Sequence, residues 1–556
     1  MEDDRSAGPG EEDRRPPPAG GRRPVALAGV LSVAAALGAS ELVAGLLPGS
    51  RSLVVAVGDA VIDLVPGPVE RAVISTVGTA DKPLLIAVIL LLSVAIGAGL
   101  GILAARRFGF GAAILVALAG VGVAALQADP QSETVPALLT GLVYVLAGVA
   151  ILKLLLAAAT AVAAADPAQA TSAPVPAPAS AGSLGAGATG ATPMERPGRG
   201  GVVDRRRFLR LAGVTAVVAG AAAAGGRFFA NDERVERIRR AIRLPRPARP
   251  APPLPAGAAL EIPGVTPLYV ANADFYRIDT ALRVPRVDPA DWSLEVKGRV
   301  DRPFSLSYAE LMAMPHLEAD ITLACVSNEV GGDLVGNARW QGVPLHVLLD
   351  RAGLQSGATQ LVGRSVDGFS AGFPTSTALD VRESMVAVAM NGEPLPIDHG
   401  FPARLVVPGL YGYVSATKWL SAIELRGWDE FDGYWIPRGW AKRGPVKTQT
   451  RIDVPAAGTT IPAGRRPIAG VAWAPTRGIE RVEVRVDDGA WQPARLAASL
   501  DVDCWRQWLL PWEATAGNHV IAVRATDGSG QVQTEERTPV APDGASGHHT
   551  IEVSVE

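Results

Sequence analysis

Long apolar runs are concentrated in the first two hundred positions of the chain, and shorter alternating patterns occupy the rest. Four of the runs are long enough to span the hydrocarbon core of a bilayer as helices. They cover residues 25–47, 84–104, 108–126 and 135–156. This pattern predicts an all-α transmembrane bundle of four helices over residues 25–165, preceded by a cytoplasmic tail of residues 1–24.

Arginines near these runs predict their orientation. Several arginines precede the first run, Arg106 and Arg107 separate the second from the third, and segment 129–136 contains no Lys or Arg. Because positively charged loops stay in the cytoplasm, the N-terminus is expected inside, and four crossings return the chain to that side. Segment 53–77 carries three acidic residues and predicts an interfacial helix. If it crossed the membrane instead, the later topology would be reversed.

The end of the apolar half contains a basic motif. Residues 166–203 are mainly Ala, Pro, Gly and Ser, which predicts a disordered linker. Segment 204–228 then begins Asp-Arg-Arg-Arg-Phe-Leu-Arg and continues as an apolar run, and it resembles a twin-arginine export signal. The alternative is a fifth transmembrane helix with ordinary inside positive charge. Both interpretations place the C-terminal half outside the cytoplasm, after a second linker of residues 229–262.

The apolar half offers little chemistry of its own. No histidine precedes His316, so these helices cannot hold a haem through paired imidazoles, and no haem is predicted. Glu41 and Lys153 lie near the ends of spans, where long side chains reach the interface. The scarcity of polar groups within the spans disfavours a transporter.

Composition excludes two further classes. A net charge of −3, without a basic stripe of interleaved aromatic residues, argues against a nucleic-acid partner. The chain of 556 residues has only two cysteines, Cys325 and Cys504, so it has no disulfide framework. That length also requires more than one domain.

Residues 263–444 have the pattern of a soluble α+β domain. Alternating apolar positions predict strands at 292–298, 361–362 and 404–407. A short helix is expected at 307–314, where Ser307 and Glu310 have the spacing of a capping box. Short strands mixed with short helices favour the α+β class.

Two segments of this domain carry candidate chemistry. Cys325 lies in an apolar strand, Thr322–Glu329, where a lone thiol is usually inert packing. Segment 391–409, which contains His399 and Arg404 among several Gly and Pro residues, follows downstream. Together they point to a soft-metal ligand beside an anionic cofactor.

Residues 445–556 change to short alternating strands separated by Gly and Asp turns, which predicts an all-β, immunoglobulin-like sandwich. Trp473, Trp505 and Trp508 are expected in its core. Cys504 is expected to be a buried small residue.

Six blocks of the C-terminal half occur in an order that resembles the sulfite oxidase family of molybdenum enzymes. They are Phe275-Tyr-Arg277, Trp292–Gly298, Cys325-x-Ser-Asn328, Trp340-x-Gly-Val-Pro-Leu345, His399–Gly409 and Lys418-Trp-Leu420. The resemblance implies molybdenum bound by molybdopterin, with the C-terminal domain mediating a homodimer.

The same resemblance implies roles for individual residues. Cys325 would supply the thiolate that binds molybdenum. Residues expected to hold the pterin and its phosphate, or to let the backbone approach them, are Tyr276, His399, Arg404, Gly409, Gly412, Ser415, Thr417 and Lys418. Tyr434 and Arg277 fall near positions where the family carries an active-site tyrosine and a substrate arginine.

One departure from the family bears on the substrate. True sulfite oxidases continue from the cysteine into a pair of arginines that meet the sulfite anion, whereas this chain continues into Asn328-Glu329-Val330. A glutamate there would repel a dianion. A neutral or zwitterionic substrate, such as a sulfoxide, therefore becomes the alternative.

These observations predict a membrane-anchored, multi-pass molybdopterin oxidoreductase that transfers an oxygen atom in a two-electron reaction outside the cytoplasm. Electrons would pass to or from a separate partner, either a cytochrome or a quinone-linked membrane protein. Two alternatives are an S-oxide reductase of the methionine sulfoxide type and a non-catalytic receptor or scaffold with an immunoglobulin-like module. Metal content separates both enzymes from the receptor.

Overall fold

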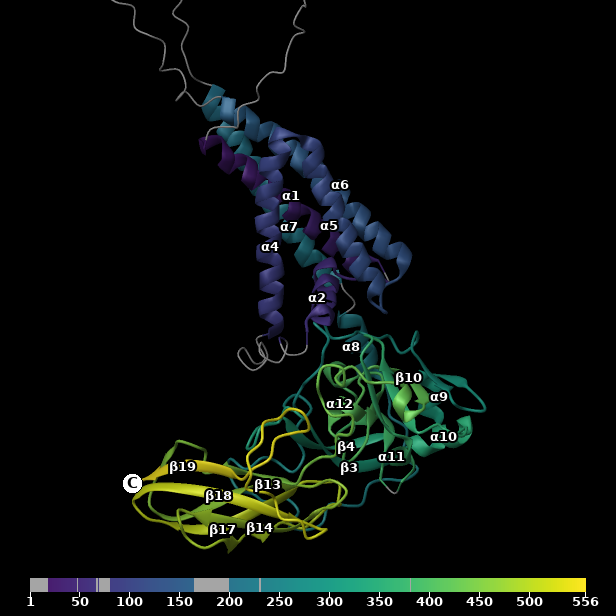
Figure 1. Cartoon of the computed structure of the whole chain (residues 1–556), viewed down its shortest axis with the longest axis vertical. Coiled ribbons are helices and arrows are strands. Elements are labelled where there is room, and N and C mark those ends of the chain that lie inside the picture. The colour runs from purple at the N-terminus through teal and green to yellow at the C-terminus, as the bar shows by residue number, and fades with distance from the viewer. Residues whose placement is uncertain are drawn as a thin grey trace, which may run out of the picture. The chain divides into compact units, whose positions relative to one another are not determined.

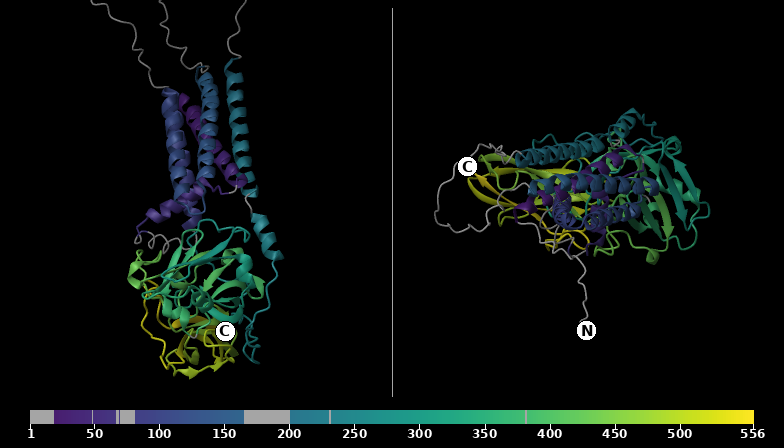
Figure 2. Two further views of the ribbon diagram at one scale, coloured as in Figure 1. Left: turned by 90° about the vertical axis from the view of Figure 1, so that its right-hand side faces the viewer. Right: turned by 90° about the horizontal axis from the view of Figure 1, so that it is seen from above.

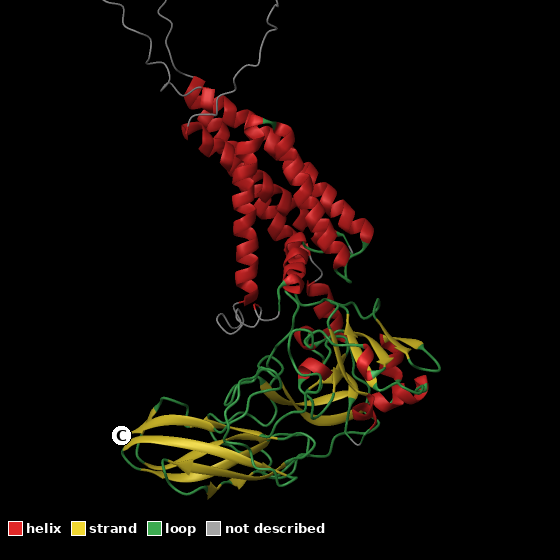
Figure 3. Ribbon diagram, in the orientation of Figure 1, coloured by secondary structure: helices red, strands yellow, loops and turns green. Residues whose placement is uncertain are grey.

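The computed structural model describes residues 19–47, 49–66, 69, 81–164, 200–229, 232–380 and 382–556. The chain divides into two compact units, one of residues 1–64 with 76–230 and one of residues 65–75 with 231–556. The described part of the first unit is helical, and the second is built largely from strands (Figures 1 and 3).

The first unit is a helical bundle whose members lie side by side (Figure 2). Its helices are α1 (Ala19–Leu46), α2 (Leu53–Leu64), α4 (Asp81–Arg106), α5 (Phe108–Ala128), α6 (Thr134–Ala164) and α7 (Gly200–Phe229). Among the described residues, five of these helices, all except α2, are long and apolar enough to cross a membrane.

Some boundaries differ from those predicted. Helix α1 begins at Ala19, within the predicted tail, and α7 begins at Gly200, within the predicted linker. Residues 166–199 of that linker lie outside the described residues. The predicted interfacial helix at 53–77 is helical as α2 over Leu53–Leu64, and residues 70–80 are not described.

Glycines allow α1 to approach its neighbours closely. A methyl group on Gly29 would lie 2.0 Å from the carbonyl oxygen of Gly97 in α4, and one on Gly45 would lie 2.0 Å from that of Gly226 in α7. Small residues at helix crossings let backbones pack together in a bilayer, where burial from water contributes little to association. Helix α7 therefore packs as a member of the bundle, and its Phe208 is buried in the bundle core.

Gly45→Leu is expected to destabilise the bundle by about 1–3 kcal/mol, because the new side chain meets the backbone of α7. Gly99→Leu is a matched control, since a methyl group on Gly99 has no atom within 4 Å among the described residues. Both variants can be compared by the temperature at which half of the detergent-solubilised protein aggregates. Equal midpoints for the two variants would contradict the observed crossing of α1 and α7.

The α+β domain of the second unit contains two sheets. The first has the order β2-β1-β10-β5-β6, and β1 pairs with β10 in parallel. Its strands are β1 (Ser293–Gly298), β2 (Phe304–Ser307), β5 (Gln360–Ser365), β6 (Ser370–Pro374) and β10 (Leu420–Arg426). The second has the order β3-β4-β7-β8, and β9 also pairs with β7. Its strands are β3 (Leu317–Ala324), β4 (Val335–Pro344), β7 (Met385–Met390), β8 (Glu393–Pro394) and β9 (Arg404–Val406).

Short helices join these strands. They are α8 (Asp232–Ala241), α9 (Tyr308–Ala313), α10 (Leu345–Ala352), α11 (Thr375–Leu379) and α12 (Gly412–Ser415), with 3₁₀ turns at Ile397–His399 and Trp428–Glu430. The capping box predicted for α9 is confirmed, because the Ser307 hydroxyl accepts from the Glu310 N–H and the Glu310 carboxylate accepts from the Ser307 N–H. Local sequence therefore fixes where this helix begins.

The C-terminal residues form two facing sheets. One has the order β11-β13-β17-β16 and the other β12-β19-β18-β14-β15. The strands are β11 (Gln449–Val454), β12 (Thr460–Ile461), β13 (Gly464–Trp473), β14 (Ile479–Val486), β15 (Gln492–Pro493), β16 (Arg495–Leu496), β17 (Arg506–Ala514), β18 (Gly517–Asp527) and β19 (His549–Val555). Trp508 lies in the core between the sheets, as predicted.

The prediction for the other two tryptophans is wrong. Trp473 and Trp505 pack in a separate cluster with Val326, Tyr411 and Tyr413 of the α+β domain. The outer face of the β11–β13–β17 sheet is therefore covered by that domain. Period-two alternation identifies two faces of a sheet but does not say which face is turned inward.

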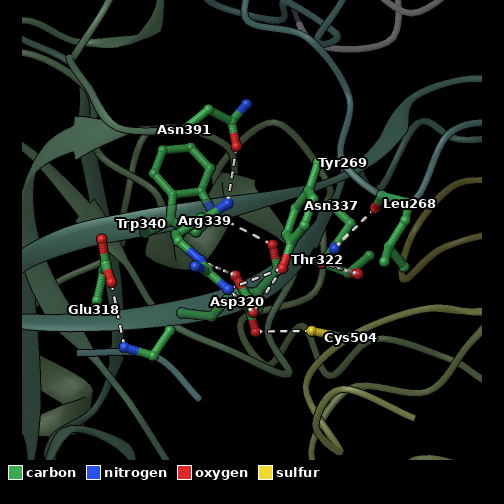
Figure 4. Close-up of polar contacts among 12 residues, drawn as sticks. Leu268, Tyr269, Glu318, Asp320, Thr322, Asn337, Arg339, Trp340, Asn391 and Cys504 are labelled. Atoms are coloured by element: carbon green, nitrogen blue, oxygen red, sulfur yellow. Dashed lines mark hydrogen bonds and ion pairs between the residues drawn. The ribbon is translucent and has the colours of Figure 1, made fainter. Parts of the chain in front are cut away.

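Polar contacts also join the sandwich to β3 (Figure 4). The Asp320 carboxylate accepts from Arg339 Nε at 2.8 Å and from the Tyr269 hydroxyl at 2.8 Å, and the Asp320 carbonyl accepts from Cys504 Sγ at 2.9 Å. Cys504 is buried, as predicted, and both Cys504 and Cys325 are free thiols. The thiol of Cys504 therefore has a structural hydrogen bond.

Candidate active site

Cys325 follows the last residue of β3, at the start of the turn that leads to β4. Its N–H donates to the carbonyl of Leu334 at 2.9 Å, and its Sγ accepts from the Ser327 N–H at 3.4 Å. The side chain is 8% exposed. Burial raises the pKa of the Cys325 thiol, and the hydrogen bond from Ser327 offsets this only in part. A nearby cation or metal is what would favour the thiolate at this place.

Tyr276 interacts electrostatically with both the thiol of Cys325 and the guanidinium of Arg404. Its ring stacks on Phe275 with the centroids 5.2 Å apart, and its hydroxyl is buried. Burial, and then the charge of Cys325, raise the pKa of Tyr276, whereas Arg404 lowers it. Cys325, Tyr276 and Arg404 thus share one electrostatic environment.

His399, Arg404 and Lys418 converge on Gly400. His399 ends a 3₁₀ turn, Arg404 begins β9, and Lys418 precedes β10. Gly400 has φ +108°, and a methyl group on it would lie 3.1 Å from both Arg404 Cβ and Lys418 Cα. Only glycine fits this crossing without strain.

Arg404 is a buried cation without a carboxylate partner among the described residues. Its described hydrogen bonds go to the carbonyls of His399, at 3.2 Å, and Leu405, at 3.4 Å. Its guanidinium lies 5.2 Å from the ring centroid of Trp340. Burial lowers the pKa of Arg404 to about 10. A buried, uncompensated charge is costly, so the site is suited to an anion.

Asp398, which is close to Arg404 in sequence, forms no ion pair with it among the described residues. Asp398 pairs with Arg277 instead, at 3.0 Å. Arg277 also lies 3.5 Å from Asp279, and its side chain is 45% exposed. Arg277, the predicted substrate arginine, therefore forms ion pairs with Asp279 and Asp398.

Lys418 is the second buried cation. Its Nζ donates to Asp279 Oδ2 at 3.0 Å and to the carbonyl of Asp398 at 3.2 Å. It also lies 4.7 Å from the ring centroid of Trp419. Burial lowers the pKa of Lys418 to about 8, although Asp279 opposes this shift.

His399 Nε2 donates to the carbonyl of Asn272 at 3.0 Å, and its ring meets Phe275 edge to face. Burial, and then the charge of Arg404, lower the pKa of His399 to about 4. The imidazole is therefore neutral at pH 7, with Nδ1 free to accept a hydrogen bond.

Acid is expected to destabilise the cofactor-free protein partly through His399. Its folded-state pKa lies below its unfolded value of 6.5, so the unfolded state binds the proton first. Stability is therefore full above pH 6.5 and falls by about 3 kcal/mol as the pH drops toward 4. Chemical unfolding of wild type and His399→Gln at pH 7 and pH 4.5 tests this. A loss of the same size in both proteins would contradict it.

The remaining residues predicted to bind the cofactor are Gly409, Gly412, Ser415 and Thr417. Gly412 lies beside the end of β3, because a methyl group on it would come within 4.0 Å of the Ala324 carbonyl. Gly409, with φ +78°, makes its close approach to Thr476 of the sandwich. The hydroxyls of Ser415 and Thr417 are buried and donate to the backbone carbonyls of Tyr411, at 3.0 Å, and Gly363, at 3.4 Å.

The structure places Tyr434 beside the β5–β6 turn. Its N–H donates to the carbonyl of Ser370 at 2.9 Å, its ring lies 5.8 Å from that of Phe369, and Arg438 stacks over it at 3.7 Å. These contacts hold Tyr434 between Phe369 and Arg438.

Two buried carboxylates near Lys418 were missed by the sequence analysis. Asp279 pairs with Lys418. Burial raises the pKa of Asp367; the charge of Asp279 raises it further, whereas the charge of Lys418 lowers it. Asp279 lies two positions after Arg277, and Asp367 precedes the glycine of a turn. Neither local pattern indicates a buried carboxylate.

Comparison with known proteins assigns this arrangement to a family. Residues 281–435 match the family model described as oxidoreductase molybdopterin binding domain. Mitochondrial sulfite oxidase of Homo sapiens is 30% identical over 325 residues, which cover 50% of this chain and 59% of that protein. The uncharacterized oxidoreductase YuiH of Bacillus subtilis is 35% identical over 157 residues, which cover 28% of this chain and 76% of that protein.

This chain belongs to the sulfite oxidase family of molybdopterin oxidoreductases. Membership makes it a molybdenum-dependent oxidoreductase with a molybdopterin cofactor. The matched region spans about three fifths of the length of the sulfite oxidases to which it is similar. Among solved structures, the sulfane dehydrogenase SoxCD from Paracoccus pantotrophus aligns with a TM-score of 0.46 and 23% identity over 51% of this chain and 80% of that one.

The residues present fit the cofactor of the family. In the described part of the chain no three His, Cys, Asp or Glu side chains gather to hold a metal ion. Cys325 offers one thiolate, and Arg404 and Lys418 offer buried positive charge to an anionic pterin. An anion bound here would compensate the charge of Arg404, which has no carboxylate partner among the described residues.

Proposed function

We propose that this protein is a membrane-anchored molybdopterin oxidoreductase that transfers an oxygen atom in a two-electron reaction, with the Cys325 thiolate bonded to molybdenum. The observation that carries the proposal is a buried thiol that shares its surroundings with a buried arginine lacking a carboxylate partner among the described residues. A soft thiolate ligand beside a cation is the arrangement that a metal held by an anionic organic ligand requires.

The roles of the side chains follow from their contacts. Arg404 and Lys418 would bind the negative charge of the pterin and its phosphate, and neutral His399 would accept a hydrogen bond at Nδ1. Tyr276 would donate its buried hydroxyl toward the same group. When bound, the cofactor supplies the oxygen-atom and electron transfer, and the protein orients it and sets its electrostatic surroundings.

The turn after Cys325 supports a neutral substrate over an anion. Asn328 uses its Oδ1 to accept from the Leu334 N–H at 2.8 Å, and Glu329 is exposed with no basic neighbour in sequence. An exposed carboxylate four residues after the thiol would repel a dianion that approaches Cys325. This observation favours the second candidate function, reduction of an S-oxide, over oxidation of sulfite.

The membrane, the compartment and the partners are parts of the same proposal. Five apolar helices would anchor the protein, and the arginine distribution favours a catalytic unit outside the cytoplasm. A separate cytochrome or quinone-linked membrane protein would exchange electrons with the metal. A homodimer would form through the sandwich.

Molybdenum content tests the proposal directly. The full-length chain, purified in detergent from a host that makes molybdopterin, is expected to hold close to one molybdenum per chain and to release a fluorescent oxidised pterin on denaturation. Chain from a host unable to make molybdopterin is the control. Metal-free and pterin-free protein from the competent host would contradict the proposal and favour a receptor or scaffold.

A further inference from the structure

The C-terminal sandwich contacts the chain on both sides of Cys325. Before the cysteine, the Thr322 N–H donates to the carbonyl of Asp503 at 3.0 Å, and the Trp505 N–H donates to Thr322 Oγ1 at 2.7 Å. Thr322 lies on β3 beside the sandwich segment that contains Cys504 (Figure 4). After the cysteine, Arg451 of β11 donates through Nη1 to the carbonyl of Gly332 at 2.6 Å.

Arg451 is held rigidly enough to fix the turn. It is 9% exposed, its Nη2 donates to Thr266 Oγ1 at 2.7 Å, and its Nε donates to Asp453 Oδ1 at 2.7 Å. Each of its three nitrogens therefore has a separate acceptor. A guanidinium bound in this way is a planar clamp with little freedom to move.

His549 of β19 contacts the neighbouring residue of the turn. Gly331 has φ +82°, and a methyl group on it would lie 2.3 Å from His549 Nε2. His549 Nδ1 accepts from the Ile452 N–H at 2.9 Å, which fixes the ring plane. The imidazole thus covers Gly331 and leaves no space for a side chain.

Hydrogen bonds within the turn from Cys325 to Leu334 connect Gly331 and Gly332, which His549 and Arg451 contact, to the thiol of Cys325. Cys325 and Leu334 close the turn by a backbone hydrogen bond, and Asn328 Oδ1 accepts from the Leu334 N–H inside it. The Gly332 N–H donates to the Glu329 carbonyl at 2.9 Å. A shift of Gly332 would therefore move the residues that hold the Ser327 N–H against Sγ.

We infer that Arg451 and His549 are positioning residues for the Cys325 thiolate. The sandwich is then part of the molybdenum site, in addition to any role in dimerisation. The inference rests on the proposed role of Cys325 as a metal ligand. A purely structural role for the two residues would change stability without changing the environment of one particular thiol.

The first test is Arg451→Gln in the full-length chain. The control is Arg466→Gln near the start of β13, since the Arg466 guanidinium bonds to the Pro462 carbonyl in the connection that precedes β13. Loss of a charge-assisted hydrogen bond is expected to raise the population of the open turn, and with it the alkylation rate of Cys325 in cofactor-free protein, by about tenfold. Peptide mass spectrometry separates Cys325 from buried Cys504, which serves as the internal reference. In loaded protein, the molybdenum(V) electron paramagnetic resonance g-values are expected to shift.

The second test does not depend on a buried charge. Gly331→Ala is expected to increase Cys325 alkylation, and the added change His549→Ala is expected to reverse part of the increase, because it removes the ring that the methyl group meets. Unchanged alkylation in Arg451→Gln and Gly331→Ala, or an equal change in Arg466→Gln, would overturn the inference. If Arg451→Gln does not fold, the comparison of Gly331→Ala with the double variant Gly331→Ala and His549→Ala still tests the inference.

The role of Cys325 as a metal ligand and its positioning by the sandwich can be refuted separately. Cys325→Ser with an unaltered molybdenum spectrum would refute the proposed ligand. The alkylation rates in cofactor-free protein would still report whether the sandwich fixes the thiol.

Discussion

Cys325→Ser is expected to reduce turnover by more than about 100-fold, since changes to residues that merely support a metal ligand already cost 10–100-fold. The variant should fold, because serine is slightly smaller than cysteine and the Cys325 backbone hydrogen bond to Leu334 does not involve the side chain. It should also retain molybdenum, because Arg404 and Lys418 would still bind the pterin. The checks are turnover with a sulfoxide and with sulfite, molybdenum content, and the absorption of the thiolate–metal bond.

Cys504→Ser is the matched control. Its thiol is also buried and donates to the Asp320 carbonyl, a bond that a serine hydroxyl can make. The control should keep the parent molybdenum spectrum. A Cys325→Ser protein with parent turnover and parent spectrum would show that the thiol is core packing, as a lone cysteine in an apolar strand usually is.

Much of the architecture could be predicted because the relevant information is local. Apolar run length located helices α4, α5 and α6, and the spacing of Ser307 and Glu310 located the start of α9. Alternation located the long strands of the sandwich. The tryptophans show the limit of this information, because Trp473 and Trp505 face the α+β domain and Trp508 faces the sandwich core. Alternation cannot distinguish a core from an interface between domains.

The site was only partly accessible from the sequence for the same reason. Residues carried by dense motifs, such as His399 and Arg404, come together around Gly400. Asp279 and Asp367 were missed because their burial beside Lys418 arises from tertiary packing of separate segments. The sequence indicated that Arg277 lies near the site. It could not indicate the ion pairs of Arg277 with Asp279 and Asp398, because these depend on how separate segments pack.

Arg404→Met is expected to change cofactor binding and stability in opposite directions. The substitution removes a buried charge whose described partners are two backbone carbonyls, so the cofactor-free protein should gain about 1 kcal/mol or more. Molybdenum occupancy should fall by more than tenfold, because a charge-assisted contact to the pterin is lost. Thermal unfolding of cofactor-free protein and metal analysis of loaded protein give the two quantities.

Arg339→Met provides the contrast, because Arg339 is a cation with a carboxylate partner whereas Arg404 has none among the described residues. Arg339 pairs with Asp320 at 2.8 Å, so its removal leaves a buried carboxylate and should cost about 3 kcal/mol in protein with or without cofactor. If Arg404→Met destabilised the cofactor-free protein in the same way, Arg404 would be a structural residue. A gain in stability together with a loss of metal would instead show that the charge of Arg404 serves to bind the cofactor. No described carboxylate compensates that charge in the cofactor-free protein.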